Sequence, residues 1–109
     1  MNAEELRRKL MEIFGNHIIF NRIFDEYAEK IKNIESSLLP WCMLLKEGKI
    51  RPIIPPKMDD GIVFIKKIDS SNRCIVIKVV NGRFREIHLG DHAYYDKLRK
   101  VLGLKGGSY

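Results

Sequence analysis

The amino-acid sequence predicts an α+β fold, in which N-terminal helices pack on an antiparallel sheet of three to four strands and a short helix follows. Apolar residues recur at helical spacing in the first 47 residues. Residues 61–89 instead carry β-branched and aromatic runs separated by turn signals. Prolines at 52, 55 and 56 predict a loop between the two halves. A length of 109 residues predicts one domain over 1–109.

The first helix is predicted near residues 3–14. Asn2 can cap it, Glu5 follows three residues later, and Gly15 ends it. The next stretch leaves two interpretations open. Residues 17–20 form a short strand before a helix near 21–34, or Asn16 caps one long helix.

The third helix is predicted near residues 37–47. Ser36 or Ser37 would start it, which places Pro40 in the first turn, where its missing N–H does no harm. Gly48 would end it.

Three strands are predicted near residues 61–68, 73–80 and 83–89. Asn81-Gly82 between two apolar runs predicts a type I′ hairpin turn. Residues 69–72 supply a second turn. The resulting register pairs Val80 with Arg83, Lys78 with Arg85, Val76 with Ile87, Cys74 with Leu89, and Ile65 with Val76. Both sheet faces carry apolar residues in this register, so both should be at least partly covered.

The net charge of +6 lies entirely in the second half of the chain. Residues 1–60 contain ten basic and ten acidic side chains, whereas residues 61–109 contain ten basic and four acidic ones. A basic sheet is suited to a polyanion, although a solvated sheet face has the same composition. The predicted RNA-binding residues are Lys66, Lys67, Lys78, Arg83 and Arg85.

Cys42 and Cys74 both sit in apolar runs, which predicts two buried thiols. The chain has no run of 18 apolar residues and no signal-peptide pattern, so we expect a soluble cytoplasmic protein with no membrane partner. No Asp, Glu and His set has metal-ligand spacing, so we expect no metal and no other cofactor.

One segment has a specific motif. Phe64 lies in the first strand pattern, Arg73 follows the next turn, and residues 90–97 read Gly-Asp-His-Ala-Tyr-Tyr-Asp-Lys. This arrangement resembles the RelE/ParE toxin superfamily, and most closely its HigB branch, which carries a Gly-Thr-His-x-x-Tyr-Asp-Lys box. Asp91 stands where that box has Thr, and the helix near 3–14 is extra. The resemblance covers about a third of the chain.

The resemblance implies a RelE-like fold and a ribonuclease toxin that cleaves mRNA, often on the ribosome. It also implies a tightly bound antitoxin protein with which the toxin forms an oligomer. By position in the motif, the matching functional residues are Arg73, His92 and Tyr95.

RNA cleavage without a metal needs a base for the 2′-hydroxyl, a cation for the charged phosphorane, and an acid for the leaving oxygen. Our hypothesis is that Arg73 stabilises the phosphorane while His92 and Tyr95 share proton transfer, with Lys66 or His88 in support. The predicted register puts Arg73 beside Gly90, two residues from His92.

Each of these residues also has a structural interpretation. His92 can cap the last helix or bond a backbone carbonyl, and His88 can be a structural histidine in the middle of a strand. The alternative function is therefore a non-catalytic nucleic-acid- or protein-binding module of the same fold. Convergence of Arg73, His92 and Tyr95 would favour the nuclease.

Overall fold

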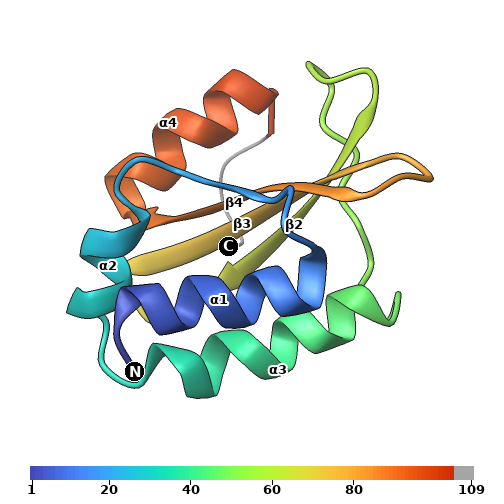
Figure 1. Cartoon of the computed structure of the whole chain (residues 1–109). Coiled ribbons are helices and arrows are strands. Elements are labelled where there is room, and N and C mark those ends of the chain that lie inside the picture. Colours follow the sequence, from blue (N-terminus) through green and yellow to red (C-terminus); the bar gives the residue numbers. More distant parts are fainter. Residues whose placement is uncertain (105–109) are drawn as a thin grey trace.

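A mixed four-stranded sheet with strand order β1-β4-β3-β2 lies at the centre of the computed structural model, which describes residues 1–104 (Figure 1). Within these residues the predicted α+β class is confirmed. The elements are α1 (Ala3–Phe14), β1 (Ile19–Phe20), α2 (Phe24–Lys30), α3 (Ile34–Lys46), β2 (Gly61–Lys67), β3 (Asn72–Val79), β4 (Phe84–Asp91) and α4 (His92–Leu102).

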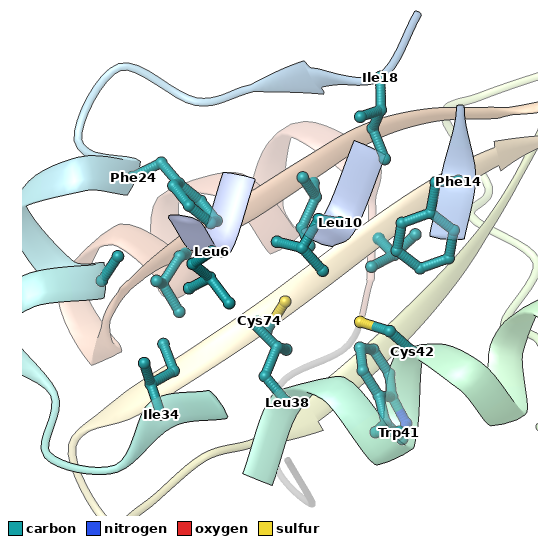
Figure 2. Close-up of a cluster of buried hydrophobic side chains, with 14 of the residues drawn as sticks. Leu6, Leu10, Phe14, Ile18, Phe24, Ile34, Leu38, Trp41, Cys42 and Cys74 are labelled. Atoms are coloured by element: carbon teal, nitrogen blue, oxygen red, sulfur yellow. The ribbon is translucent and has the colours of Figure 1, made fainter. Parts of the chain in front are cut away.

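Helices cover both faces of the sheet, as its two apolar faces predict. The first three helices pack on one face, where α1 and α3 run along the sheet, and α4 lies on the other (Figure 1). Figure 2 shows the larger core, in which Leu6 and Leu10 of α1 and Leu38 of α3 surround Cys74 of β3. A smaller core joins Ile75 and Ile77 of β3 to Tyr95 and Leu102 of α4, together with Val63.

The start of the chain follows the prediction closely. Helix α1 has the predicted bounds, and the Asn2 side chain accepts a hydrogen bond from the Glu5 N–H at 2.8 Å. Gly15 ends the helix with φ of 105°, a conformation that favours glycine. The short-strand interpretation of residues 17–20 is confirmed, and the single long helix is wrong.

Residues 21–46 differ from the prediction in their helix boundaries. Helix α2 is shorter than predicted because Ile31 is extended. Helix α3 starts at Ile34, after Asn33 adopts the left-handed conformation with φ of 54°. Pro40 is therefore the seventh residue of α3, and its predicted place in the first turn is wrong. The early start buries Ile34 on the same helix face as Leu38, which offsets the hydrogen bond lost at Pro40.

The sheet differs from the purely antiparallel prediction at β1. Strands β2, β3 and β4 are antiparallel, but β1 runs parallel to β4, with Ile19 opposite Glu86 and Phe20 opposite Ile87. The prediction assigned residues 17–20 no partner, because a two-residue strand carries no register signal.

Part of the predicted register is confirmed. Val76 pairs with Ile87, and Cys74 pairs with Leu89. The pairing of Ile65 with Val76 is wrong by one position, since Ile65 lies opposite Ile75. That shift turns Phe64 toward the larger core and Val63 toward α4.

The β3–β4 hairpin contains a bulge that the prediction lacks. Lys78 pairs with Phe84 rather than Arg85, and Arg85 is the extra residue in β4. The turn is not type I′, because only Asn81 has positive φ (56°) while Gly82 does not. Instead the Gly82 N–H donates to the Val79 carbonyl, so Val80 leaves the ladder and does not pair with Arg83. The bulge turns Phe84 into the larger core, 4.5 Å from the Phe14 ring centroid.

The two cysteines are buried free thiols, as predicted. Burial raises the pKa of the Cys42 thiol to about 12 and also raises that of Cys74. No helix in residues 1–104 is both long and apolar enough to cross a membrane.

Candidate functional site

Strand β4 passes directly into α4, and Asp91 forms the joint. Its Oδ1 accepts a hydrogen bond from the Tyr94 N–H at 2.9 Å, which caps the helix. Its Oδ2 accepts a hydrogen bond from the Tyr27 hydroxyl of α2 at 2.9 Å. These two bonds hold the pKa of Asp91 below its usual value, the bond from the Tyr94 N–H most strongly. Asp91 therefore supplies a helix cap at the position where the HigB box has Thr.

Three polar side chains form a hydrogen-bonded chain beside this joint. His88 Nδ1 lies 2.7 Å from the Tyr94 hydroxyl, and His88 Nε2 lies 2.9 Å from Glu86 Oε1. The His88 side chain is 12% exposed and that of Glu86 is 29% exposed. We call this set the Tyr94–His88–Glu86 chain. It is semi-buried and lies on the face of β4 that α4 covers in part.

The local sequence explains why these groups meet. Glu86 and His88 are two residues apart on a strand, so their side chains share one face. Gly90 is next on that face, and a Cβ there would lie 2.8 Å from the Tyr94 ring. Glycine at position 90 thus lets Tyr94 lie close against the strand and reach His88.

The hydrogen bonds define a protonation pattern. The bond from His88 is the main cause that lowers the pKa of Glu86, so Glu86 is a carboxylate and can only accept. His88 Nε2 therefore donates to Glu86, and in the neutral ring Nδ1 accepts from the Tyr94 hydroxyl. Desolvation raises the pKa of Tyr94, against a hydrogen bond from the Asn21 side chain that lowers it.

Arg85 borders this chain but is engaged in ion pairs. Its Nε lies 3.1 Å from Glu86 Oε2, and its Nη1 lies 3.7 Å from Asp60 Oδ1. Arg85 was predicted as an RNA-binding residue, and the structure gives it two acidic neighbours.

The three residues matched by the HigB box lie in different environments. Arg73 is 6% exposed, and its Nη1 donates to the backbone carbonyls of Asp69 and Asn72. Tyr95 is 2% exposed and belongs to the smaller core. The His92 side chain is 54% exposed, and its Nδ1 lies 3.2 Å from Asp96 Oδ2.

One pair among these three residues, His92 and Tyr95, is in contact, and Arg73 lies on the adjacent strand β3. Arg73 lies opposite Gly90, as predicted, and the rings of His92 and Tyr95 meet edge to face with centroids 5.8 Å apart. His88, predicted in a supporting role, joins Tyr94 and Glu86, which sequence reasoning did not select. The available signal was the Glu-x-His alternation on a strand that ends in the same box.

The five predicted RNA-binding residues are spread over the sheet. Lys66 pairs with Cys74, and Lys78 pairs with Ile62, so these two lysines are about 13 Å apart along the strands. The Lys78 ammonium also lies over the Phe84 ring, 5.7 Å from its centroid. Lys67 is exposed at the end of β2, and Arg83 is exposed in the hairpin turn.

Residues 1–104 contain no group of three or more His, Cys, Asp or Glu side chains placed to hold a metal ion, and no pocket. The candidate groups lie along the open surface at the β4–α4 joint. No protein-family model, curated protein or solved structure matches this chain.

Proposed function

We propose that this protein is an endoribonuclease that cleaves mRNA in the cytoplasm without a metal ion, on or off the ribosome. In this proposal it is the toxin of a toxin–antitoxin pair, with a RelE-like fold, and its antitoxin binds it in an oligomer. The observation that carries the proposal is a pair of histidines at the β4–α4 joint. Each has a carboxylate beside a ring nitrogen: His88 is hydrogen-bonded to Glu86 at 2.9 Å, and His92 lies within ion-pair distance of Asp96, at 3.2 Å.

Two imidazoles can supply the base and the acid that RNA transesterification requires. One takes the proton of the 2′-hydroxyl, and the other gives a proton to the leaving 5′-oxygen. His88 and His92 are four residues apart, so their Cα atoms are at most about 14 Å apart. In this proposal the two side chains flank one phosphodiester group.

The remaining residues have supporting roles in this proposal. Arg73, opposite Gly90, supplies positive charge next to the joint, as the phosphorane needs. Tyr95 contacts the His92 ring and orients it. Sequence-independent attraction for the RNA backbone comes from Lys66, Lys67, Lys78 and Arg83. Arg85 contributes to the same attraction, although it also pairs with two acidic side chains.

One observation favours the alternative, a non-catalytic nucleic-acid- or protein-binding module. Arg73 and Tyr95 are both buried, and Arg73 donates to two backbone carbonyls of the β2–β3 turn. Such residues can serve packing alone. The two functions differ in whether bound RNA is cut.

The test incubates end-labelled RNA with the protein, with and without ribosomes, in the presence and absence of EDTA. The nuclease proposal predicts cleavage that EDTA does not stop, with 2′,3′-cyclic phosphate and 5′-hydroxyl ends. RNA that binds and stays intact under every condition would support the binding module instead.

A further inference from the structure

We infer that Tyr94 is a catalytic residue that contacts the RNA 2′-hydroxyl, with His88 and Glu86 behind it as positioning residues in a proton relay. This inference rests on the proposed function and identifies the group that takes the proton from the 2′-hydroxyl. It makes Tyr94, which the HigB-box match passed over in favour of its neighbour Tyr95, the residue that meets the substrate.

Hydrogen-bond accounting at the Tyr94 oxygen supports this role. A phenol hydroxyl has one hydrogen to donate and two lone pairs that can accept. The hydrogen goes to His88 Nδ1 at 2.7 Å, which leaves both lone pairs as acceptor positions, and the nearby Asn21 side chain can occupy one of them. One acceptor position is left, which is what an incoming 2′-hydroxyl needs.

The Tyr94 oxygen is also fixed in place. The Tyr94 backbone N–H donates to Asp91, and its ring packs against Gly90. Asn21 is itself fixed, because its amide makes two hydrogen bonds with the Leu89 backbone, at 3.0 and 2.9 Å. Contacts with β4 and with the start of α4 thus hold the Tyr94 side chain in place, and such fixed placement lowers the cost of reaching a reactive geometry.

Exposure distinguishes Tyr94 from Tyr95. Tyr95 is 2% exposed in the smaller core, whereas Tyr94 is partly exposed beside a His88 side chain that is itself 12% exposed. A substrate at the surface of the joint can therefore meet Tyr94 without any rearrangement of the core.

The step consists of three proton transfers, and at phosphorus one bond forms while another breaks. The 2′-hydroxyl gives its proton to the Tyr94 oxygen, while Tyr94 gives its own proton to His88 Nδ1. The 2′-oxygen bonds to phosphorus, the bond from phosphorus to the 5′-oxygen breaks, and protonated His92 gives the leaving oxygen its proton. The products are a 2′,3′-cyclic phosphate and a 5′-hydroxyl. His88 then returns its proton through Tyr94 to solvent, and His92 takes up a proton from solvent, which restores both groups.

Glu86 stabilises the charge that this transfer creates. When His88 becomes an imidazolium, its Nε2 faces the Glu86 carboxylate at 2.9 Å. Arg85 contacts the other oxygen of Glu86 at 3.1 Å and holds the carboxylate in orientation. Tyr94 stays neutral throughout, which suits its desolvated site.

The experiment measures single-turnover RNA cleavage and RNA affinity for four variants of the full chain. Tyr94→Phe, which removes only the hydroxyl, should lower the cleavage rate about 10²- to 10⁴-fold with unchanged affinity. His88→Ala should lose a similar factor and recover activity with added imidazole, which a purely structural role would not allow. Glu86→Gln should lower the rate without a change in the KM.

Tyr27→Phe is the matched control. It also removes a phenol hydroxyl bonded to a side chain near the joint, at 2.9 Å from Asp91, but it lies outside the relay. Its cleavage rate should stay within about twofold of the wild type, because the Tyr94 N–H keeps its hydrogen bond to the other oxygen of Asp91. Wild-type cleavage with full activity in Tyr94→Phe would overturn the relay alone. Wild-type protein that cleaves no RNA would overturn the proposed function and the relay with it.

Discussion

Single side chains at the β4–α4 joint each serve more than one element. Asp91 caps α4 and accepts a hydrogen bond from Tyr27 of α2, while Glu86 joins His88 to Arg85. Because such residues hold elements together and also contact the proposed catalytic groups, a substitution can change both stability and activity. The two effects are best separated by isosteric substitutions and by measurements at several pH values.

Glu86 provides a pH test at the residue scale. Its pKa is lowered in the folded protein, chiefly by the hydrogen bond from His88, so its stabilising effect is complete above the ordinary value of 4.5. That effect is lost as the pH falls through the lower, folded-state pKa. Glu86→Gln should therefore reduce the free energy of unfolding by about 1 kcal/mol at pH 7, after allowance for solvent screening.

Urea unfolding of both proteins at several pH values checks this expectation. The difference between wild type and Glu86→Gln should shrink as the pH falls below 4.5. A difference that keeps growing as the pH falls below 4.5 would contradict the assigned charge state of Glu86.

At the scale of elements, the bulge in the β3–β4 hairpin decides which residues of β4 are buried. It directs Phe84 into the larger core against Phe14 and leaves its neighbour Arg83 exposed. Phe84→Ala should lower the free energy of unfolding by about 3–4 kcal/mol because it removes a buried aromatic ring. Arg83→Ala, the exposed control, should change it by no more than about 0.5 kcal/mol. Equal losses in urea unfolding would contradict this packing.

The same hairpin shows what the sequence can and cannot predict. The strands, the Val76–Ile87 pair and the Cys74–Leu89 pair follow from alternation and from the position of the turn. The bulge at Arg85 does not follow, because it depends on the space that Phe14 offers to Phe84 across the core. Likewise the sequence motif indicates the His92 segment, but the link from His88 to Tyr94 depends on how closely α4 packs at Gly90.

At the scale of the whole molecule, the +6 charge in residues 61–109 predicts RNA binding that weakens steeply with salt. Arg85 is a poor position for a charge reversal, because Glu86 and Asp60 would then face a third carboxylate. Lys67 and Arg83 are exposed and suit the test. Lys67→Glu with Arg83→Glu should weaken RNA binding and reduce the slope of log K against log salt by about 1.4.

The control for this variant carries the same charge change in the other half of the chain. Arg8→Glu with Lys9→Glu alters two exposed positions of α1, on the other side of the sheet from α4. Its RNA affinity should fall much less. Equal losses in the two double variants would mean that only net charge matters and that the basic sheet is no binding surface.

Cleavage of end-labelled RNA by wild-type protein and His92→Ala, in the presence of EDTA, tests the central claim most directly. Wild type should cut the RNA to 2′,3′-cyclic phosphate ends. His92→Ala should be about 10²- to 10⁴-fold slower, with unchanged RNA affinity and thermal stability, because the exposed imidazole makes few packing contacts. Intact RNA with the wild type, with and without ribosomes, or equal rates in the two proteins would contradict the account.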